Sequence, residues 1–276
     1  MTELNPVQEH YTVADLPGRI ERALRAAGFG GGRIEWSALA PIDQFHVRGL
    51  AATEALAEGL GLTGGESVLD VGCGLGGPAR YLAAAHGCHV TGIDLTPAYI
   101  EAAEMLGRRA GLADRLTFVQ GDALDLPFLP DSFDAAWTQH VGMNIADKEG
   151  LYRGVHRVLR PGGRLAIYDV MAGDGRPVLY PVPWAREAGS SFLATPEETA
   201  RALRAAGFRE VSSADTTPEG LSWFAGLRAA APAAGGAAAF SLASLLGADV
   251  GQWTANFARN LAEGRARLQQ MIARKD

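Results

Sequence analysis

Short apolar runs alternate with helical patterns between Ser67 and Asp169, and this alternation constrains the fold more than any other feature of the chain. Strands are predicted at 67–71, 89–94, 116–120, 133–137 and 164–168, and helices are predicted at 77–85, after Pro97 and after Asp147. Strands that alternate with helices form a parallel sheet with crossover helices. In such sheets the ligand binds at the carboxyl ends of the strands. The sequence therefore predicts an α/β fold with its site at that edge.

The segments before and after this alternating region are predicted to cover the site. Residues 1–60 carry two amphipathic helical patterns, at 16–27 and 46–60, and residues 217–264 are expected to form a helical insert or lid. Neither segment has enough apolar residues for a core of its own. We therefore expect a single domain, with an N-terminal helical cap at 1–60, a core at 61–216, the insert at 217–264, and a last strand and tail at 265–276.

A glycine-rich turn lies directly between the first predicted strand and the helix that follows it. It reads Asp70-Val-Gly-Cys-Gly-Leu-Gly-Gly77. Glycines let the backbone turn tightly and let a ligand approach closely. Gly72, Gly74 and Gly77 also satisfy G-x-G-x-x-G, so the turn by itself fits a dinucleotide as well as other nucleotides, and a purely structural turn would use glycines too.

Carboxylates follow the next two strands, where a nucleoside would lie. Asp94 ends the second strand and can accept hydrogen bonds from ribose hydroxyls, a placement that serves NAD and S-adenosylmethionine equally. Asp122 ends the third strand, within Gly121-Asp-Ala123, and can accept from the adenine amino group. Either residue alone could be an ordinary loop or cap carboxylate. Aligned with the glycine turn, the two predict a nucleoside site.

At this point a family resemblance becomes visible. Five motifs follow one another in residues 67–169: Val68-Leu-Asp-Val-Gly-Cys-Gly-Leu-Gly-Gly-Pro78, Gly92-Ile-Asp94, Gly121-Asp-Ala123, Leu126-Pro-Phe128 with Ser132-Phe-Asp134, and Arg157-Val-Leu-Arg-Pro-Gly-Gly163. Through these motifs the segment resembles class I S-adenosylmethionine-dependent methyltransferases, most closely the UbiE/Coq5-like and sarcosine/dimethylglycine N-methyltransferase groups. The resemblance implies a Rossmann-like seven-stranded, mostly parallel sheet with an antiparallel last strand, flanked by helices. It favours a strand over a helix end at 266–273.

The resemblance also implies the cofactor and the residues around it. S-adenosylmethionine would be the methyl donor, and S-adenosylhomocysteine would be the product. The cofactor-binding residues expected from the family motifs are Asp70, Gly72, Gly74, Asp94, Leu95, Asp122, Ala123 and Gln139.

The methyl acceptor is expected at the end of the fourth strand, which reads Trp137-Thr-Gln-His-Val-Gly-Met-Asn144. This segment lacks the Asp/Asn-Pro-Pro-Tyr pattern that resembles nucleobase amino methylation. The phosphoethanolamine and dimethylglycine relatives have an Asp and, four residues on, a His, where this chain has His140 and Asn144, so their amine substrates are in doubt. His140 is the predicted general base because histidine titrates near neutral pH; the alternative is a hydrogen bond without proton transfer. The substrate contacts are predicted to be Trp137, Met143, Asn144 and Trp184.

Two residues of the N-terminal cap complete the predicted catalytic set. The resemblance suggests that Tyr11 closes over the methyl donor and that His46 faces the pocket. The alternative for both is helix capping and packing.

Charge and composition restrict the class of binding partner that we expect. The net charge is −6 and the basic residues are scattered, which disfavours nucleic acid. Two cysteines make no disulfide framework, no signal peptide is visible, and no apolar run reaches the roughly 18 residues of a membrane span, so a cytoplasmic protein without a membrane or metal is expected. The oligomeric state stays open, with a homodimer as one option.

The sequence therefore predicts a methyltransferase for a small-molecule nitrogen, oxygen or carbon nucleophile. One alternative is a nicotinamide oxidoreductase, but the chain has no Tyr-x-x-x-Lys, and its only lysines are Lys148 and Lys275. The other is a methyltransferase fold that binds the cofactor without methylating.

Overall fold

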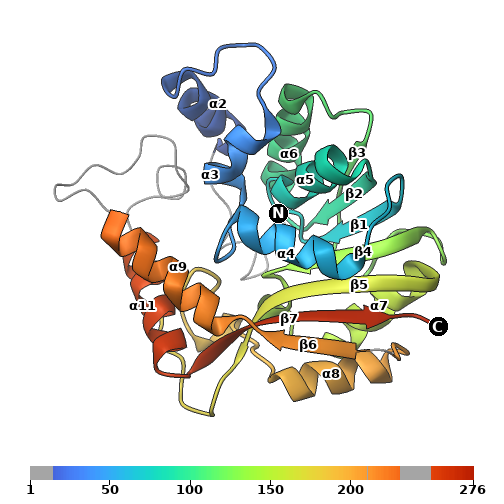
Figure 1. Ribbon diagram of the computed structural model, residues 1–276, viewed down its shortest axis with the longest axis vertical. Helices are drawn as coiled ribbons and strands as arrows, with labels where there is room; N and C mark the ends of the chain where they lie inside the picture. The colour runs from blue at the N-terminus through green and yellow to red at the C-terminus, as the bar shows by residue number, and fades with distance from the viewer. Residues whose placement is uncertain (1–14, 210, 231–249) are drawn as a thin grey trace, which may run out of the picture.

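A seven-stranded sheet forms the centre of the protein in the computed structural model, which describes residues 15–209, 211–230 and 250–276 (Figure 1). The strands lie in the order β3-β2-β1-β4-β5-β7-β6. β7 runs antiparallel to β5 and β6, and the other neighbouring pairs are parallel. The predicted Rossmann-like sheet with an antiparallel last strand is confirmed. Its strands are β1 (Ser67–Val71), β2 (His89–Asp94), β3 (Leu116–Gln120), β4 (Phe133–Gln139), β5 (Leu159–Ala172), β6 (Val211–Asp215) and β7 (Ala266–Arg274).

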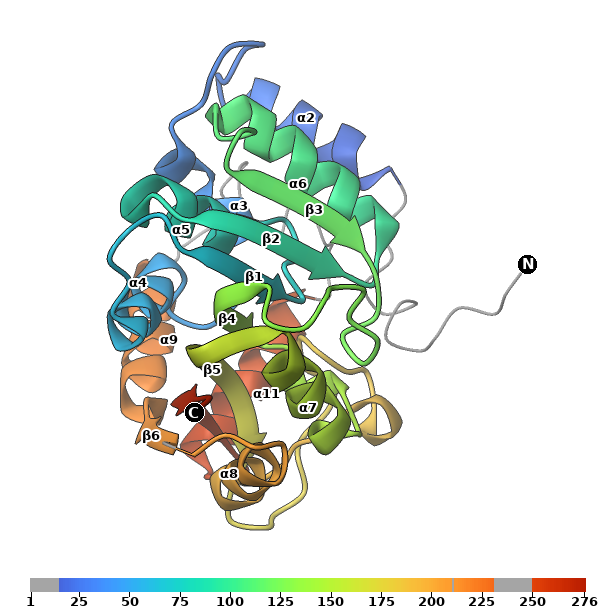
Figure 2. The same cartoon turned by 90° about the vertical axis from the view of Figure 1, so that its right-hand side faces the viewer.

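Helices cover both faces of the sheet, and Figure 2 shows α4 and α9 on the opposite side from α7. The described α-helices are α2 (Leu16–Ala26), α3 (Ala40–Asp43), α4 (Leu50–Leu60), α5 (Gly77–His86), α6 (Pro97–Ala110), α7 (Lys148–Val158), α8 (Pro196–Ala205), α9 (Thr217–Ala230) and α11 (Val250–Ala262). Short 3-10 helices are η1 (Trp36–Leu39), η2 (Gly142–Asn144) and η3 (Ala188–Ser190). None of the described helices is long and apolar enough to cross a membrane.

The sheet is buried on both faces because successive side chains of a strand point to opposite sides. In β1, Val68 packs in the cluster that includes residues of α4, α5, α9 and α11. Its neighbour Leu69 packs in the cluster formed with α7 and α8. The short apolar runs of the sequence are thus strands covered by helices on both sides.

Two predicted boundaries differ from the observed ones. The helix expected from His46 begins only at Leu50, because Arg48 and Gly49 have positive φ angles of 70° and 53°, which are incompatible with a right-handed helix. The strand expected at 164–168 is the long strand β5, which follows α7 directly and pairs with β7 from Arg164 to Ala172. Within the helical insert expected at 217–264, residues 231–249 lie outside the described residues.

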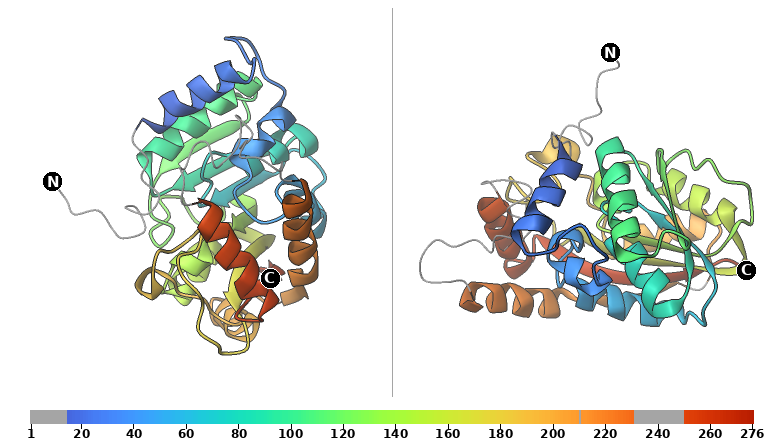
Figure 3. Two further views of the ribbon diagram at one scale, coloured as in Figure 1. Left: turned by 90° about the vertical axis from the view of Figure 1, so that its left-hand side faces the viewer. Right: turned by 90° about the horizontal axis from the view of Figure 1, so that it is seen from above.

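The N-terminal helices pack beside the half of the sheet that contains β1, β2 and β3. α2 lies along α6 (Figure 3), and Leu16, Ile20 and Leu24 share one buried cluster with residues of α6. α3 is tied to α5 by a buried ion pair, in which Arg80 Nη2 lies 2.7 Å from Asp43 Oδ2. The segment that connects α3 to α4, which carries His46, is thereby held against the edge of the sheet where the strands end.

Candidate active site

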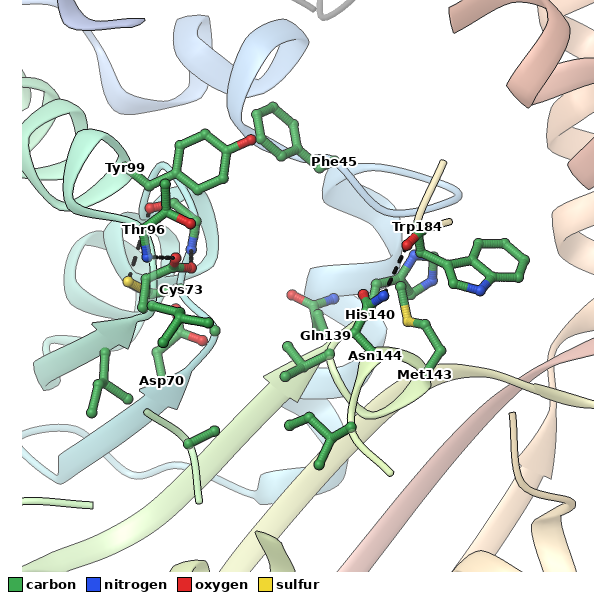
Figure 4. A pocket seen from close by; sticks show the side chains of 18 of the residues that line it. Phe45, Asp70, Cys73, Thr96, Tyr99, Gln139, His140, Met143, Asn144 and Trp184 are labelled. Atoms are coloured by element: carbon green, nitrogen blue, oxygen red, sulfur yellow. Dashed lines mark hydrogen bonds between the residues drawn. The ribbon is translucent and has the colours of Figure 1, made fainter. Parts of the chain in front are cut away.

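A cavity of about 570 Å³ lies at the carboxyl ends of β1, β2, β3 and β4. This is the crevice predicted from the strand order, since β1 lies between β2 on one side and β4 on the other. Figure 4 shows two groups of side chains in it, one with Asp70, Cys73, Thr96 and Tyr99 and the other with Gln139, His140, Met143, Asn144 and Trp184. We refer to them as the donor end and the acceptor end.

The glycine turn forms the floor of the donor end. Gly72 has a φ of 70°, and a side chain there would collide with Val141, so this position requires glycine. Gly74 has a φ of 52°, and the space where its Cβ would lie is open. A ligand can therefore approach the backbone of the turn at Gly74.

Asp94 connects the end of β2 to this turn. Its Oδ2 accepts a hydrogen bond from the Gly74 backbone N–H at 3.0 Å, and its Oδ1 accepts from the Thr96 N–H at 2.9 Å. Burial raises the pKa of Asp94, while these backbone donors act in the opposite direction. Each carboxylate oxygen keeps a second lone pair that can accept from a ligand hydroxyl. The Thr96 side chain, which precedes α6, makes no helix-capping hydrogen bond.

Asp70 places a buried carboxylate at the same end of the cavity. It is 2% exposed, and its Oδ2 has no hydrogen-bond partner among the described residues. Burial, with a smaller contribution from the nearby Asp94, raises the pKa of Asp70 to about 7. A buried polar atom without a partner is costly, so this oxygen fits a ligand that supplies a donor or a positive charge.

His140 follows β4 and begins the acceptor end. Its φ of 54° is strained for a residue with a side chain, a conformation that concentrates at functional sites. Its backbone N–H donates to the Tyr168 carbonyl at 2.8 Å, and its ring centroid lies 5.0 Å from that of Tyr168 and 6.0 Å from that of His46. Burial, and secondarily His46, lowers the pKa of His140 well below 6.5. The expectation that His140 titrates near neutral pH is therefore wrong, because this imidazole is neutral there.

His46 lines the cavity from the N-terminal cap, opposite His140. Its Nε2 lies 2.9 Å from the Gly49 carbonyl oxygen and 3.0 Å from Thr53 Oγ1. Because a carbonyl only accepts, we assign the proton to Nε2, which leaves Nδ1 as a hydrogen-bond acceptor. Burial lowers the pKa of His46 to about 4, so this ring is also neutral.

Trp137 does not contact the cavity, and its predicted role as a substrate contact does not fit the structure. The side chain is fully buried in the core beneath the acceptor end. Its indole Nε1 donates to Gln139 Oε1 at 3.0 Å. Since an indole nitrogen only donates, this bond fixes the Gln139 amide with its oxygen toward Trp137. The Gln139 Nε2 is then a buried donor that has no acceptor in the described part of the chain.

The far wall of the acceptor end consists of η2 and the segment 183–192. Asn144 Nδ2 donates to the Trp184 carbonyl at 2.8 Å, and the Trp184 indole donates to Ser191 Oγ at 2.9 Å. The Trp184 ring lies 5.0 Å from the ring of Phe257 in α11, so the late helices back this wall. Asn144 and Trp184 line the cavity, together with Met143.

Lys148 joins the two parts of this wall, a role that the sequence did not reveal. Its Nζ donates to the carbonyls of Gly142 at 2.8 Å and Phe192 at 2.6 Å, and also to that of Ile145. The buried Asp169 carboxylate lies beneath η2; burial raises its pKa to about 7, against the lowering effect of Lys148. The only available signal was the scarcity of lysine, which says nothing about position.

The structure brings the other predicted residues together. Those that line the cavity are His46, Asp70, Gly72, Gly74, Asp94, Leu95, Asp122, Ala123, Gln139, His140, Met143, Asn144 and Trp184. Tyr11 lies outside the described residues. Within 15–209, 211–230 and 250–276, no three histidine, cysteine or acidic side chains are grouped to hold a metal ion. Phe45 and Phe192 also line the cavity and were not predicted.

Comparisons with known proteins agree on the core. Residues 69–167 match a family model described as a methyltransferase domain. The methyltransferase GfsG of Streptomyces halstedii is 41% identical over 136 residues, which cover 49% of this chain and 49% of GfsG. The chain spans less than half the length of the first curated relatives that it matches. The resemblance to class I S-adenosylmethionine-dependent methyltransferases is thereby confirmed for the core.

Two solved structures resemble the whole chain. Geranyl diphosphate C-methyltransferase from Streptomyces coelicolor A3(2) superposes with a TM-score of 0.71 at 19% identity, covering 100% of both chains, which shows a shared fold. The [4+2]-cyclase SpnF superposes with a TM-score of 0.64 at 27% identity, covering 93% of both chains.

Proposed function

We propose that this chain, which carries a methyltransferase domain, transfers a methyl group from S-adenosylmethionine to a small molecule and releases S-adenosylhomocysteine. The observation that carries the proposal is the single cavity that joins a nucleoside-binding turn to an acceptor end. Asp70, Asp94 and Asp122 lie at the donor end, and the neutral His140 lies at the acceptor end.

The donor end has groups that match each part of the cofactor. The unpartnered Asp70 carboxylate suits the positively charged amino group of the methionine moiety. Asp94 can accept from the ribose hydroxyls and Asp122 from the adenine amino group. Gly72, Gly74, Leu95, Ala123 and Gln139 complete the cofactor-binding set. When bound, S-adenosylmethionine supplies a methyl group activated on a positively charged sulfur.

The protein's own contribution is alignment and proton transfer. Holding donor and acceptor in line can contribute about 7–11 kcal/mol to the barrier reduction. Met143, Asn144 and Trp184 would hold the acceptor, with Tyr11 and His46 as further members of the predicted catalytic set. His140 would accept a proton if the acceptor must lose one, which adds roughly 10²–10⁴-fold.

The test combines ligand binding with methyl transfer. We expect S-adenosylhomocysteine to raise the melting temperature of the purified protein and NAD to leave it unchanged. We also expect labelled methyl from S-adenosylmethionine to appear in small molecules of a cell extract. Stabilisation by NAD alone would instead indicate the oxidoreductase.

The same experiments test the alternative that the protein binds the cofactor but does not transfer its methyl group. One solved protein of this fold is named a [4+2]-cyclase. Tight S-adenosylhomocysteine binding together with no methyl transfer to any extract fraction would support that alternative.

The same proposal includes three further expectations: the chain is one functional unit, it is cytoplasmic, and it can form a homodimer. We propose that the chain is one functional unit, in which the N-terminal helices and the helices α9 and α11 cover the site. Cell fractionation tests the cytoplasmic location, and light scattering after gel filtration tests the homodimer.

A further inference from the structure

We infer that the methyl acceptor is an uncharged, largely apolar molecule that presents a hydroxyl group, and that its oxygen is methylated. This inference rests on the proposed function and narrows the substrate class of the same site. Four features of the acceptor end support it, and each concerns the charges and side chains that the acceptor would meet.

An anionic acceptor finds no positively charged side chain in the described lining of the cavity. None of the described residues that line the cavity is a lysine or arginine. The nearby Lys148 donates to three backbone carbonyls, and the fully buried Arg80 is paired with Asp43 at 2.7 Å. Segments 1–14 and 231–249, which the structure does not describe, contain no lysine or arginine in their sequence. A phosphate or carboxylate would therefore be buried without a partner, which costs several kcal/mol in effective terms.

At the acceptor end of the described lining, no buried carboxylate is left without a partner for a cationic acceptor, and Asp147 is exposed to solvent. Asp43 pairs with Arg80, and Asp147 Oδ1 accepts from the Gly150 backbone N–H at 2.8 Å at the start of α7. The remaining lining carboxylates, Asp70, Asp94 and Asp122, stand at the donor end.

The surface that is left for the acceptor is apolar, with neutral polar groups. Apolar lining side chains at this end include Met143, Ile145, Pro183, Trp184 and Phe192. The polar groups include the two imidazoles, the side chains of Asn144 and Ser190, and the amide of Gln139, whose Nε2 is an unused donor within the described ranges. Such a surface excludes charge but can orient one hydroxyl group.

The two neutral imidazoles provide what an oxygen nucleophile needs. A hydroxyl group must lose its proton during methyl transfer, whereas a carbon–carbon double bond does not need a base to begin the reaction. The acceptor oxygen forms the bond to the methyl carbon, the carbon–sulfur bond breaks with its electron pair remaining on sulfur, and the O–H proton passes to the imidazole of His140. His46, whose Nδ1 is free to accept, can hold the hydroxyl group before the transfer.

The depressed pKa of His140 is compatible with this step because the charge in the cavity is conserved. One positive charge, on sulfur, is present before the transfer, and one, on the imidazole, is present after it. An uncharged acceptor therefore moves a buried charge over a short distance and creates none. The imidazolium can then return its proton to water.

Two experiments test the substrate class, and a variant tests the base. First, binding is measured by calorimetry in the presence of S-adenosylhomocysteine for three probes with one skeleton: 2-(2-naphthyl)ethanol, 2-(2-naphthyl)ethylamine and the phosphate ester of the alcohol. We expect the alcohol to bind at least about tenfold more tightly than either charged probe. Preferential binding of the amine or the phosphate would overturn the inference.

Second, a cell extract is separated by ion exchange into cationic, anionic and uncharged fractions, and each is incubated with the protein and S-adenosylmethionine carrying a ¹³C methyl group. We expect label in the uncharged fraction, with the ¹³C chemical shift of a methoxy group. Label in a charged fraction, or an N-methyl or C-methyl shift, would refute the inference and leave the proposed function intact. No label in any fraction would count against the proposed function itself.

His140→Asn separates the role of the base from that of the pocket. We expect this variant to bind the alcohol probe with an affinity within about threefold of the wild type and to lose roughly 10²–10⁴-fold in turnover. An unchanged turnover would exclude proton transfer to His140.

Discussion

Asp70 offers a direct test of how the donor end recognises its ligand. Its Oδ2 is buried and unpartnered in the described part of the chain. If this oxygen accepts from the amino group of the cofactor, Asp70→Asn removes a charged hydrogen bond with almost no change of shape. Hydrogen bonds to charged groups contribute about 1.5–3 kcal/mol, so we expect the dissociation constant of S-adenosylhomocysteine to rise by about 10–150-fold.

The pH dependence gives this prediction a second, independent part. Burial raises the pKa of Asp70 to about 7, so below that pH the carboxyl of the free protein is protonated. The ligand's ammonium group requires the ionised form, and binding must then release a proton. The affinity should fall by about tenfold for each pH unit below 7 and should be nearly constant above it. Asp70→Asn should abolish this dependence.

Isothermal titration calorimetry with S-adenosylhomocysteine, from about pH 5.5 to about pH 8.5, measures both effects, and buffers of different ionisation enthalpy count the released proton. Asp122→Asn is the matched control, because it should weaken binding at the adenine and keep the wild-type slope. A dissociation constant for Asp70→Asn within about twofold of the wild type, together with an unchanged slope, would refute the assignment of Asp70 to the ammonium group.

The stability of the free protein should fall as the pH rises, whereas the affinity for the ligand should increase. The folded-state pKa of Asp70 lies above its ordinary value of 3.8, so the folded state holds the proton more tightly and stability is lost as the pH rises from about 4 to about 7. A pKa difference of this size corresponds to at most about 4 kcal/mol. Asp70→Asn should therefore raise the melting temperature at pH 8 while it weakens ligand binding. A lower melting temperature would show that the ionised carboxylate has a stabilising partner.

Three further predictions concern residues around the site. Lys148→Met removes three hydrogen bonds that join the two parts of the acceptor wall, so the KM for the acceptor should rise while calorimetry gives an unchanged S-adenosylhomocysteine affinity; a change confined to cofactor affinity would contradict this role. Arg80→Met leaves the carboxylate of Asp43 buried without its partner and should cost about 3–5 kcal/mol in urea unfolding, and adding Asp43→Leu should recover most of the loss. The pKa of His46 is lowered to about 4, so its contribution to stability is present above pH 6.5 and is lost as the pH falls toward 4, by about 3 kcal/mol; His46→Asn should flatten this part of the stability profile, and an unchanged profile would show that His46 is accessible to protons.

The donor end could be predicted from the sequence because its residues are fixed by position along the strands. A parallel sheet brings the carboxyl ends of its strands to one edge, so Asp70, Asp94 and Asp122 converge whatever surrounds them. The preference for glycine at position 72 follows from its positive φ of 70°, which is a local property of the turn. Neither conclusion needs a particular side-chain contact between residues that are far apart in the chain.

The acceptor end could be predicted only in part because it depends on such contacts. Trp137 lies two residues before the end of β4, on the same side of the strand as Gln139, and is therefore beneath the cavity. Alternation along a strand indicates the side of the sheet on which a residue lies, but it does not show whether that residue lines the cavity or is buried beneath it. Lys148 meets Phe192 across 44 residues of sequence, and no periodicity predicts this contact.

The protonation state of His140 is a property of the site that the sequence cannot predict. An isolated histidine titrates near pH 6.5, and the sequence alone can assign no other value to His140. Its depressed pKa comes from burial among Tyr168 of β5, Phe257 of α11 and His46 of the cap, which are three separate segments. An imidazole in this environment stays neutral in the free protein and can accept a proton when the sulfur beside it loses its positive charge. Methyl transfer from a sulfonium to an uncharged acceptor that loses a proton makes that exchange, so the burial that cannot be predicted from the sequence suits this base to uncharged acceptors.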